Sequence, residues 1–322
     1  MRIAEIMCGA IALSSAAGGC AQDYPTRIIR MVVPGTPGGS ADILARMMGA
    51  KLHERLGQPV VIENRSGAGQ MIGAEYIAKS APDGHTLMLA TISYTTSVAT
   101  RASLPFDPVN DVAGITMVGQ GPLVLVVHPS LPVKSVRELI AMAKARPGYI
   151  NYASSGNGTI IHLVAEVFAA RAQIDIVHVP YKAIAAAVTD TVGGHVPMTF
   201  ASLPAAWSQV EAHRLRALAV TTGKRSEFVP HLPTLAEAGV PGFDASTWWG
   251  LFTQGKTPKG IVARLNGEMQ KIVVAEDVKA RLTAEGAQAV LGMSPDAFST
   301  LIRNEIAMWR KIAKERNLKG DS

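Results

Sequence analysis

Short runs of β-branched residues alternate with longer segments whose apolar residues recur every three or four positions, and this alternation continues along most of the chain. The short runs have the length of buried strands, and the longer segments have the period of amphipathic helices. In the first third, the pattern predicts strands over 28–33, 60–63 and 86–91 and helices over 43–56 and 71–79. This strand–helix repeat indicates a parallel sheet whose loops gather at one edge.

The rest of the chain repeats the alternation and then becomes helical. Further strands are predicted over 114–118, 123–127, 150–153, 176–179, 198–200, 215–220 and 248–252, and further helices over 135–145, 160–171, 183–192, 258–274, 276–284 and 295–316. A helical tail cannot bury its apolar face alone, so we expect it to pack on the first half of the chain. We therefore predict two α/β lobes, one of residues 22–125 plus 246–322 and one of residues 126–245. Two chain crossings, near 124–127 and 245–249, would form the hinge between them.

The first predicted strand ends in a glycine-rich turn. Pro34 stops the strand, three glycines follow within five residues, and Ser40 or Asp42 then opens a helix. The first amides of a helix and the positive end of its dipole favour a carboxylate or phosphate by up to roughly 1–2 kcal/mol. A well-capped strand-to-helix turn without a ligand explains the same residues equally well.

A second turn of the same kind lies in the second block. The segment 154–159, Ser-Ser-Gly-Asn-Gly-Thr, joins a predicted strand to a predicted helix. With one such turn in each lobe, a small anion between the lobes could be held from both sides. The pair therefore favours an anion site over an ordinary turn.

Composition narrows the class of partner. The 322 residues are 48% hydrophobic and 5% aromatic, which suits a compact α/β protein in two domains. The net charge of +6 is not concentrated in any run of Lys and Arg, so a nucleic-acid partner is not expected. A mildly basic surface suits a protein that meets small organic anions.

The first 21 residues have the layout of a secretory leader, with a short apolar core and small residues at its end. We expect cleavage after Ala21 and a periplasmic location, with lipid attachment at Cys20 as the alternative. Both cysteines, Cys8 and Cys20, lie in this segment. The mature chain would then have no thiol, which excludes disulfides, thiolate metal sites and cysteine nucleophiles.

The motifs of common enzyme classes are missing. There is no nucleophile elbow, Walker loop or zinc-protease motif. We interpret His162 and Glu166, four residues apart, as a surface contact rather than a metal site. Segment 67–73 is one residue longer than a dinucleotide fingerprint, so we interpret it as a backbone turn beside the same edge. Trp248 and Trp249 could stack on a ligand or pack at the lobe junction.

Several segments share the order and spacing of one protein family. They are Tyr24-Pro25, 28–34 (Ile-Ile-Arg-Met-Val-Val-Pro), 38–46 (Gly-Gly-Ser-Ala-Asp-Ile-Leu-Ala-Arg), 56–65, 67–69, 81–84 (Ala-Pro-Asp-Gly), 151–159, 178–182 (His-Val-Pro-Tyr-Lys), 215–221 and 233–239. On these residues the chain resembles the substrate-binding proteins of tripartite tricarboxylate transporters, the TctC or Bug family. The resemblance covers nearly the whole chain after the leader.

The resemblance implies a two-lobe periplasmic binding protein of the type II class. Such a protein closes on an organic carboxylate and passes it to a membrane carrier with one large and one small subunit. The family holds the carboxylate between the two glycine turns with backbone amides and ordered water. Carried over to this chain, the ligand-binding residues are Gly38, Gly39, Ser40, Asp42, Ser154, Ser155, Gly156, Gly158, Thr159, Tyr181 and Lys182. We expect a monomer with no catalytic residue, no metal and no cofactor.

Four positions of the second lobe depart from the family's pattern. Ala183 stands in place of the usual Gly, Ala186 in place of Pro, Ala201 in place of Asp, and Pro197 in place of Asp or Val. Fewer acidic groups there suit a more anionic or more apolar acid. Two other functions stay open: a periplasmic ligand sensor that feeds a membrane receptor, and an enzyme that uses the interlobe cleft for a cofactor.

Overall fold

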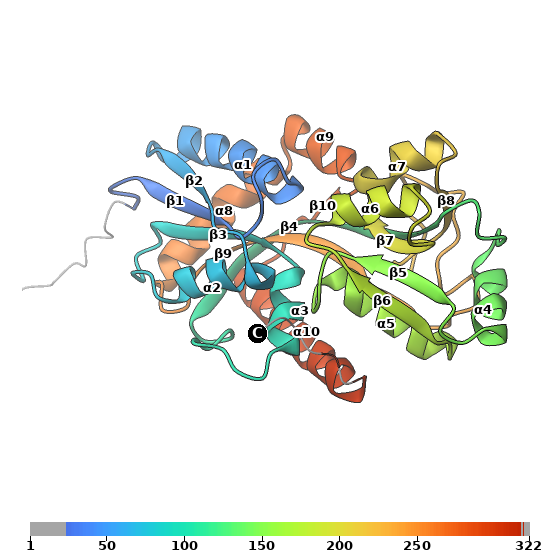
Figure 1. Cartoon of the computed structure of the whole chain (residues 1–322). Helices are drawn as coiled ribbons and strands as arrows, with labels where there is room; N and C mark the ends of the chain where they lie inside the picture. The colour runs from blue at the N-terminus through green and yellow to red at the C-terminus, as the bar shows by residue number, and fades with distance from the viewer. Residues whose placement is uncertain (1–23, 317, 319–322) are drawn as a thin grey trace, which may run out of the picture.

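Two mixed β-sheets that share one long strand organise residues 24–316 and 318, the residues that the computed structural model describes (Figure 1). The predicted leader over 1–21, with Cys8 and Cys20, lies outside the described residues. Lobe 1 is built on β2 (Val60–Asn64), β1 (Ile29–Val33), β3 (Thr86–Thr91), β9 (Ser246–Gln254), the first part of β4 (Val112–Val127) and β10 (Gln288–Ala289). Lobe 2 is built on the last part of β4 with β7 (Met198–Ser202), β5 (Ile150–Ser154), β6 (Ile176–Pro180) and β8 (Arg216–Val220).

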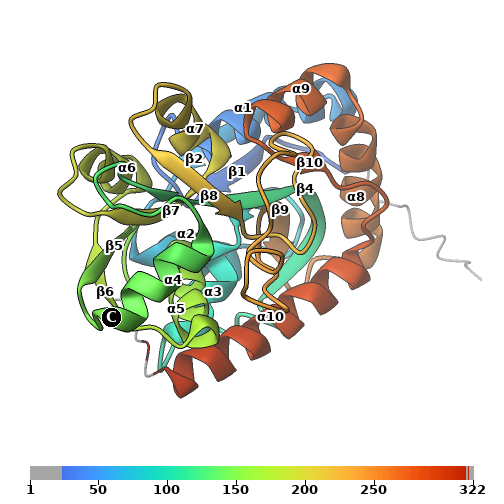
Figure 2. The same ribbon diagram turned by 90° about the vertical axis from the view of Figure 1, so that its right-hand side faces the viewer.

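Helices cover both faces of each sheet, as Figures 1 and 2 show. Their bounds are α1 (Ser40–Leu56), the 3-10 helix η1 (Ala68–Gln70), α2 (Met71–Ala78), α3 (Ser93–Thr100), α4 (Val136–Ala145), α5 (Ile160–Ala172), α6 (Ile184–Val192), α7 (Leu203–Glu211), α8 (Lys259–Val273), α9 (Glu276–Ala284) and α10 (Pro295–Glu315). Side chains along β3 alternate between the two faces of the sheet, and apolar residues on both faces need a helix layer to cover them. Leu87 and Leu89 pack in one apolar cluster with residues of α1, α8 and α9, while Met88 and Ala90 pack in another with residues of α2, α3 and α10.

The shared strand β4 joins the two lobes. It pairs with β9 as far as Pro122 and with β7 and β8 from Leu123 onward. Two separate strands had been expected over 114–118 and 123–127, and that expectation is wrong. Gly119, Gly121 and Pro122 suggested a break, but the ladder with β9 continues through all three. The chain returns to lobe 1 at Ala245, whose amide donates to the carbonyl of Thr221.

The strand directions bring the turns of both lobes to the lobe junction. β1 and β3 run parallel to the first part of β4, toward lobe 2. β5 and β7 run antiparallel to the last part of β4, toward lobe 1. Because loops after parallel strands gather at the carboxyl edge, the turns after β1 and β5 both lie at this junction.

One helix at the junction, α3, was not predicted, whereas the long helix predicted over 295–316 is confirmed as α10. The sequence pattern predicts no helix between the strands over 86–91 and 114–118, but Ser93–Thr100 forms α3. Its polar side chains hide it from a hydrophobic pattern, because Thr95, Thr96 and Ser97 are buried and the two threonines donate to carbonyls of the preceding turn. The long helix α10 packs on α3 and β4, with Phe298, Ile302, Ile306, Trp309 and Ala313 on its buried face.

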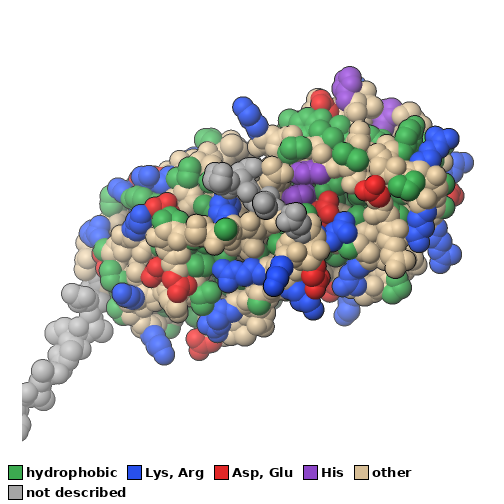
Figure 3. All heavy atoms as spheres, turned by 60° about the horizontal axis from the view of Figure 1, so that its bottom comes forward, with side chains coloured by type: hydrophobic (Ala, Val, Ile, Leu, Met, Phe, Trp, Pro, Cys, Tyr) green, Lys and Arg blue, Asp and Glu red, His purple; other side chains and the backbone are tan. Residues whose placement is uncertain are grey.

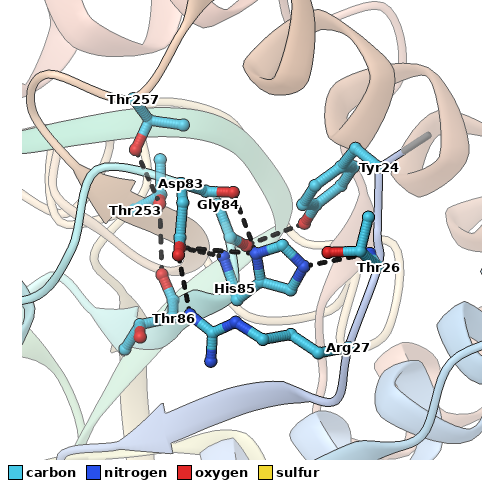
Figure 4. A network of polar contacts seen from close by, with 9 residues as sticks. All are labelled: Tyr24, Thr26, Arg27, Asp83, Gly84, His85, Thr86, Thr253 and Thr257. Carbon is cyan, nitrogen blue, oxygen red and sulfur yellow. Dashed lines mark hydrogen bonds and ion pairs between the residues drawn. The ribbon is translucent and has the colours of Figure 1, made fainter. Parts of the chain in front are cut away.

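The outer end of lobe 1 is fastened by the Asp83–His85 turn (Figure 4). The Tyr24 hydroxyl donates to the carbonyl of Gly84 at 2.7 Å, and Arg27 forms an ion pair with Asp83 at 2.7 Å. The buried ring of His85 accepts from the Thr26 amide at 3.2 Å. These contacts tie the segment before β1 to the start of β3, and so help fix β1 at the end opposite its turn.

A buried carboxyl links three elements beside the hinge. Glu305 of α10 accepts from the indole of Trp248 on β9 at 3.0 Å and lies 2.9 Å from the hydroxyl of Thr95 on α3. Burial raises the pKa of Glu305 to about 7, although both hydrogen bonds oppose the rise. A protonated Glu305 can donate to Thr95, whose own hydroxyl then donates to Ile92.

We expect the contribution of Glu305 to the free energy of unfolding to decrease as the pH rises from about 4.5 to about 7. Over this range the folded protein keeps a proton on Glu305 that the unfolded chain has released, and the loss could reach about 3 kcal/mol. The variant Glu305→Gln resembles the protonated form, so this part of the pH dependence should disappear. Urea unfolding of both proteins at about pH 5 and about pH 8 measures the difference. Equal pH dependence in the two proteins would contradict the prediction.

Candidate functional site

The turn of lobe 1 leads directly from β1 into α1. The helix begins at Ser40, three residues before the predicted start, and its N-cap is Gly39 rather than Ser40 or Asp42. As at the start of any helix, the first amides have no acceptor within the helix. No side chain caps them here. The Ser40 hydroxyl accepts from the indole of Trp249 at 3.0 Å. This bond fixes the start of α1 to the returning hinge strand.

Asp42 holds the lobe 1 turn together. Its carboxylate accepts from the Gly38 amide at 2.9 Å, from Asn64 at 3.0 Å and from Arg46 at 3.0 Å. Burial alone would raise the pKa of Asp42, but these hydrogen bonds outweigh it and hold the pKa below its ordinary value. The side chain is only 4% exposed. Its observed partners lie in the turn, in α1 and at the end of β2, so a ligand would meet the backbone that Asp42 shapes.

The turn of lobe 2 is built in the same way from β5 into α5. Thr159 is the N-cap, and its hydroxyl donates to the carbonyl of Gly156 at 2.8 Å while accepting from Ser155 at 3.1 Å. The Ser154 hydroxyl accepts from the Gly156 amide at 3.1 Å. Gly156 and Gly158 have φ of +118° and +74°, which favour glycine, so the backbone of this turn depends on them.

Two histidines behind the lobe 2 turn were missed as site residues. His178 of β6 lies with Nε2 2.6 Å from the Ser154 hydroxyl, and Nδ1 of His162 accepts from the Gly158 amide at 3.1 Å. The interpretation of His162 and Glu166 as a surface contact is wrong. His162 is 5% exposed, and Glu166 accepts instead from Tyr152 at 2.7 Å. Position carries a signal that was overlooked: His162 follows Gly158 by four residues, as Asp42 follows Gly38.

The remaining predicted residues, Tyr181 and Lys182, follow β6. The Tyr181 hydroxyl donates to Asp190 of α6 at 2.7 Å, and burial, followed by this bond, raises the pKa of Tyr181 to about 12. Lys182 is exposed beside it. Two of the positions that differ from the family's pattern lie in different surroundings. Ala183 is the N-cap of α6, whereas Ala201 is fully buried on β7 opposite Val124.

The glycine segment after β2 also lies at this edge. Gly67 and Gly69 have φ of +129° and +59°, and a Cβ at Gly69 would collide with the hydroxyl of Ser97 on α3. The side chain of Gln70 accepts from the Thr91 amide at 3.2 Å, which ties the segment to the end of β3. These glycines allow the segment to approach α3 and β3 closely.

The two tryptophans pack at the lobe junction. Trp248 is 1% exposed and Trp249 is 3% exposed. Their indole groups donate to Glu305 and Ser40 respectively. Of the two interpretations left open, the structure supports packing.

A separate cavity of about 490 Å³ lies at the hinge. It is lined by Gln120, Gly121, Pro122, Thr222, Gly223, Lys224, Arg225, Ser226, Phe228, Asp244, Ser246, Gly286 and Gln288. None of these residues belongs to either glycine turn. The cavity is therefore a second place where a ligand could be held, and an experiment must distinguish it from the turns.

The described residues meet neither the requirements of a metal site with three or more ligands nor those of a membrane-spanning helix. Within residues 24–316 and 318, no group of three or more His, Cys, Asp or Glu side chains could hold a metal ion. No helix in this part of the chain is both long and apolar enough to cross a membrane. Figure 3 shows Lys and Arg side chains scattered among acidic ones on one face. The scatter agrees with the absence of basic runs in the sequence.

Comparisons with known proteins give one consistent result. The family model described as tripartite tricarboxylate transporter family receptor, TctC, matches residues 44–318. Protein BugT of Bordetella pertussis is 39% identical over 301 residues, 93% of this chain and 92% of BugT.

Two solved structures from Rhodopseudomonas palustris are similar over almost their whole length. Rpa4515 with adipate is 38% identical with a TM-score of 0.83, covering 92% of this chain and 99% of that one. MatC with bound malate is 30% identical with a TM-score of 0.80, covering 90% and 99%. The predicted two-lobe, binding-protein-like α/β fold is confirmed by these neighbours.

Proposed function

Because the chain belongs to the tripartite tricarboxylate transporter receptor family, TctC, we propose that it captures a small organic carboxylate between its lobes and delivers it to a membrane transporter with one large and one small subunit. We place it in the periplasm and assign it binding without catalysis. The relatives with adipate and malate support the ligand class.

The observation that carries the proposal is the pair of turns before α1 and α5. Each turn follows a strand that points at the lobe junction, and each opens a helix whose first amides have no acceptor within the helix. In this proposal the carboxylate contacts the backbone of Gly38, Gly39 and Ser40 from lobe 1. It contacts Ser155, Gly156 and Thr159 from lobe 2, directly or through water.

In this proposal the two lobes close on the ligand because each lobe carries one half of the binding site. An open form presents one turn at a time, whereas a closed form presents both. The ligand therefore favours the closed form only by the affinity that it gains from the second turn. A switch from almost fully open to almost fully closed requires about 5.5 kcal/mol of differential affinity.

A thermal-shift panel of dicarboxylates, tricarboxylates, aromatic acids and amino acids tests the ligand class. At 100 times its dissociation constant, a ligand that binds only the folded protein should stabilise it by about 2.7 kcal/mol. We expect acids without an amino group to give the largest shifts, since Ala201 of the second lobe stands where the family's pattern has Asp, and Pro197 where it has Asp or Val, so that neither provides a carboxylate for an amino group. A larger shift with a neutral or cationic amino compound than with any carboxylate would contradict this assignment.

A further inference from the structure

The lobe 2 turn is held from behind by two stacked imidazole rings. The ring centroids of His162 and His178 lie 4.0 Å apart, and the ring planes differ by 11°. One ring accepts from the Gly158 amide, and the other contacts the hydroxyl of Ser154. Both partners belong to the turn that is proposed to hold the ligand. The histidines therefore lie where they can set the shape of the turn.

Lobe 1 uses the same arrangement with a different acceptor. Gly38 and Gly158 have nearly the same φ, +77° and +74°. Each donates its amide to the side chain four residues later, which is a carboxylate in Asp42 and an imidazole in His162. The sequences around the two turns otherwise differ. Recurrence of the same bond indicates that the glycine amide needs an acceptor for the turn to keep its shape.

We propose that His162 is a positioning residue of the ligand site, that it acts through the unprotonated Nδ1 atom, and that His178 positions the Ser154 hydroxyl beside it. The inference rests on the proposed function and specifies how that site is held. An imidazole accepts a hydrogen bond only at a ring nitrogen without a proton, and imidazolium has donors alone. A proton on Nδ1 of His162 would therefore face the Gly158 amide with another donor and displace the turn.

The two lobes consequently respond differently to acid. Asp42 remains an acceptor at mildly acidic pH because its hydrogen bonds keep its pKa low. Histidine normally changes charge between about pH 5 and pH 8. The lobe 2 turn is thus the part of the site whose shape depends on pH. Protonation of a residue that touched the ligand carboxylate directly would strengthen binding, whereas protonation of this positioning residue weakens it.

Among the described residues, charged and titratable groups from β5, α5, α3 and the segment after α10 surround the pair or lie on elements packed against it. Tyr152 of β5 stacks on His178 at 5.0 Å and donates to Glu166 of α5, which also pairs with Arg316 beyond α10 at 3.1 Å. Burial raises the pKa of Tyr152, so it stays a neutral donor. Tyr94 of α3, which packs on α5, donates to the carbonyl of Pro108. Because the two imidazoles are stacked, a proton on one opposes a proton on the other.

Two variants of His162 distinguish loss of the hydrogen-bond acceptor from loss of the volume of the imidazole ring. His162→Leu removes the acceptor and leaves the Gly158 amide buried without one, so adipate should bind about tenfold or more weakly at pH 8. His162→Asn restores a neutral acceptor and should recover most of that loss. His85→Gln is the matched control, because it removes an equally buried imidazole from the far end of lobe 1. Calorimetric titration with adipate measures all four proteins, and equal affinity of His162→Leu and the native protein would overturn the proposal.

Nuclear magnetic resonance tests the same point without a ligand. The ring ¹⁵N shifts of His162 should show an unprotonated Nδ1 at pH 8, and the Gly158 amide shift should follow His162 as it titrates while the Gly38 amide does not. Adipate affinity should fall in the native protein as Nδ1 gains its proton, and stay constant in His162→Asn over the same range. An affinity that rises with protonation would overturn the positioning role. If adipate binds to none of the proteins, the proposed ligand fails, and the amide shifts still decide the inference.

Discussion

Replacing Gly39 of the lobe 1 turn or Gly156 of the lobe 2 turn with valine should weaken carboxylate binding more than about 100-fold, a loss of roughly 2.7 kcal/mol, while the protein stays folded. At Gly156 the backbone has φ of +118°, which side chains rarely adopt, and a Cβ would lie 3.4 Å from the Tyr181 carbonyl. At Gly39 a Cβ would lie 3.2 Å from the Thr36 carbonyl. Gly156→Val and Gly39→Val therefore displace the two turns from opposite lobes.

The controls separate the turns from the hinge cavity. Gly267 of α8 has open space around it, so Gly267→Val should bind normally. Gln288→Trp fills part of the hinge cavity from an exposed position without touching either turn. Calorimetry with the best acid of the thermal-shift panel gives the affinities. Native affinity in both turn variants would refute the placement of the site, and loss in Gln288→Trp alone would move the site to the hinge cavity.

Phe298→Ala should lower the free energy of unfolding by about 3–5 kcal/mol, which is typical of a large buried ring. Phe298 of α10 is fully buried against β9, and its ring centroid lies 5.1 Å from that of Phe252 and 5.7 Å from that of Trp248. A Cβ at Gly114 would lie only 2.7 Å from its ring. The ring thus fills space that two strands leave free for it, and alanine would leave a cavity.

Urea unfolding of Phe298→Ala and the native protein measures this loss. Met308→Ala on the same helix is the matched control, because Met308 is 46% exposed and its removal should cost about 0.5 kcal/mol or less. Equal midpoints for Phe298→Ala and the native protein would show that α10 does not depend on this contact.

Much of the fold could be predicted because strands and helices here have strong and different periods. The residues of β3 alternate between two apolar clusters, and the buried residues of α10 recur every three or four positions. The two glycine turns were found because glycines and polar residues stand between a strand and a helix in both halves. Neither signal requires knowledge of contacts between distant residues.

Three features depended on distant contacts and were missed. The polar helix α3 is buried because α10, η1 and α2 cover it, which its own sequence does not reveal. His178 became a site residue because β6 pairs with β5 and carries its ring to Ser154. Ser40 was predicted as a cap or ligand contact, but its hydroxyl is bound by a tryptophan 209 positions later in the chain. Local patterns cannot predict such partners.

The continuous strand β4 changes how the two lobes can move. Pro122 has no amide to donate, and it stands where β4 exchanges β9 for β7 and β8. A small change in twist at this residue would rotate one sheet against the other while the hydrogen bonds on either side stay formed. Opening would then bend a strand elastically and would not require a linker to unfold. The open and closed forms would therefore share nearly all of their backbone hydrogen bonds. Without a ligand, the two forms would differ little in free energy.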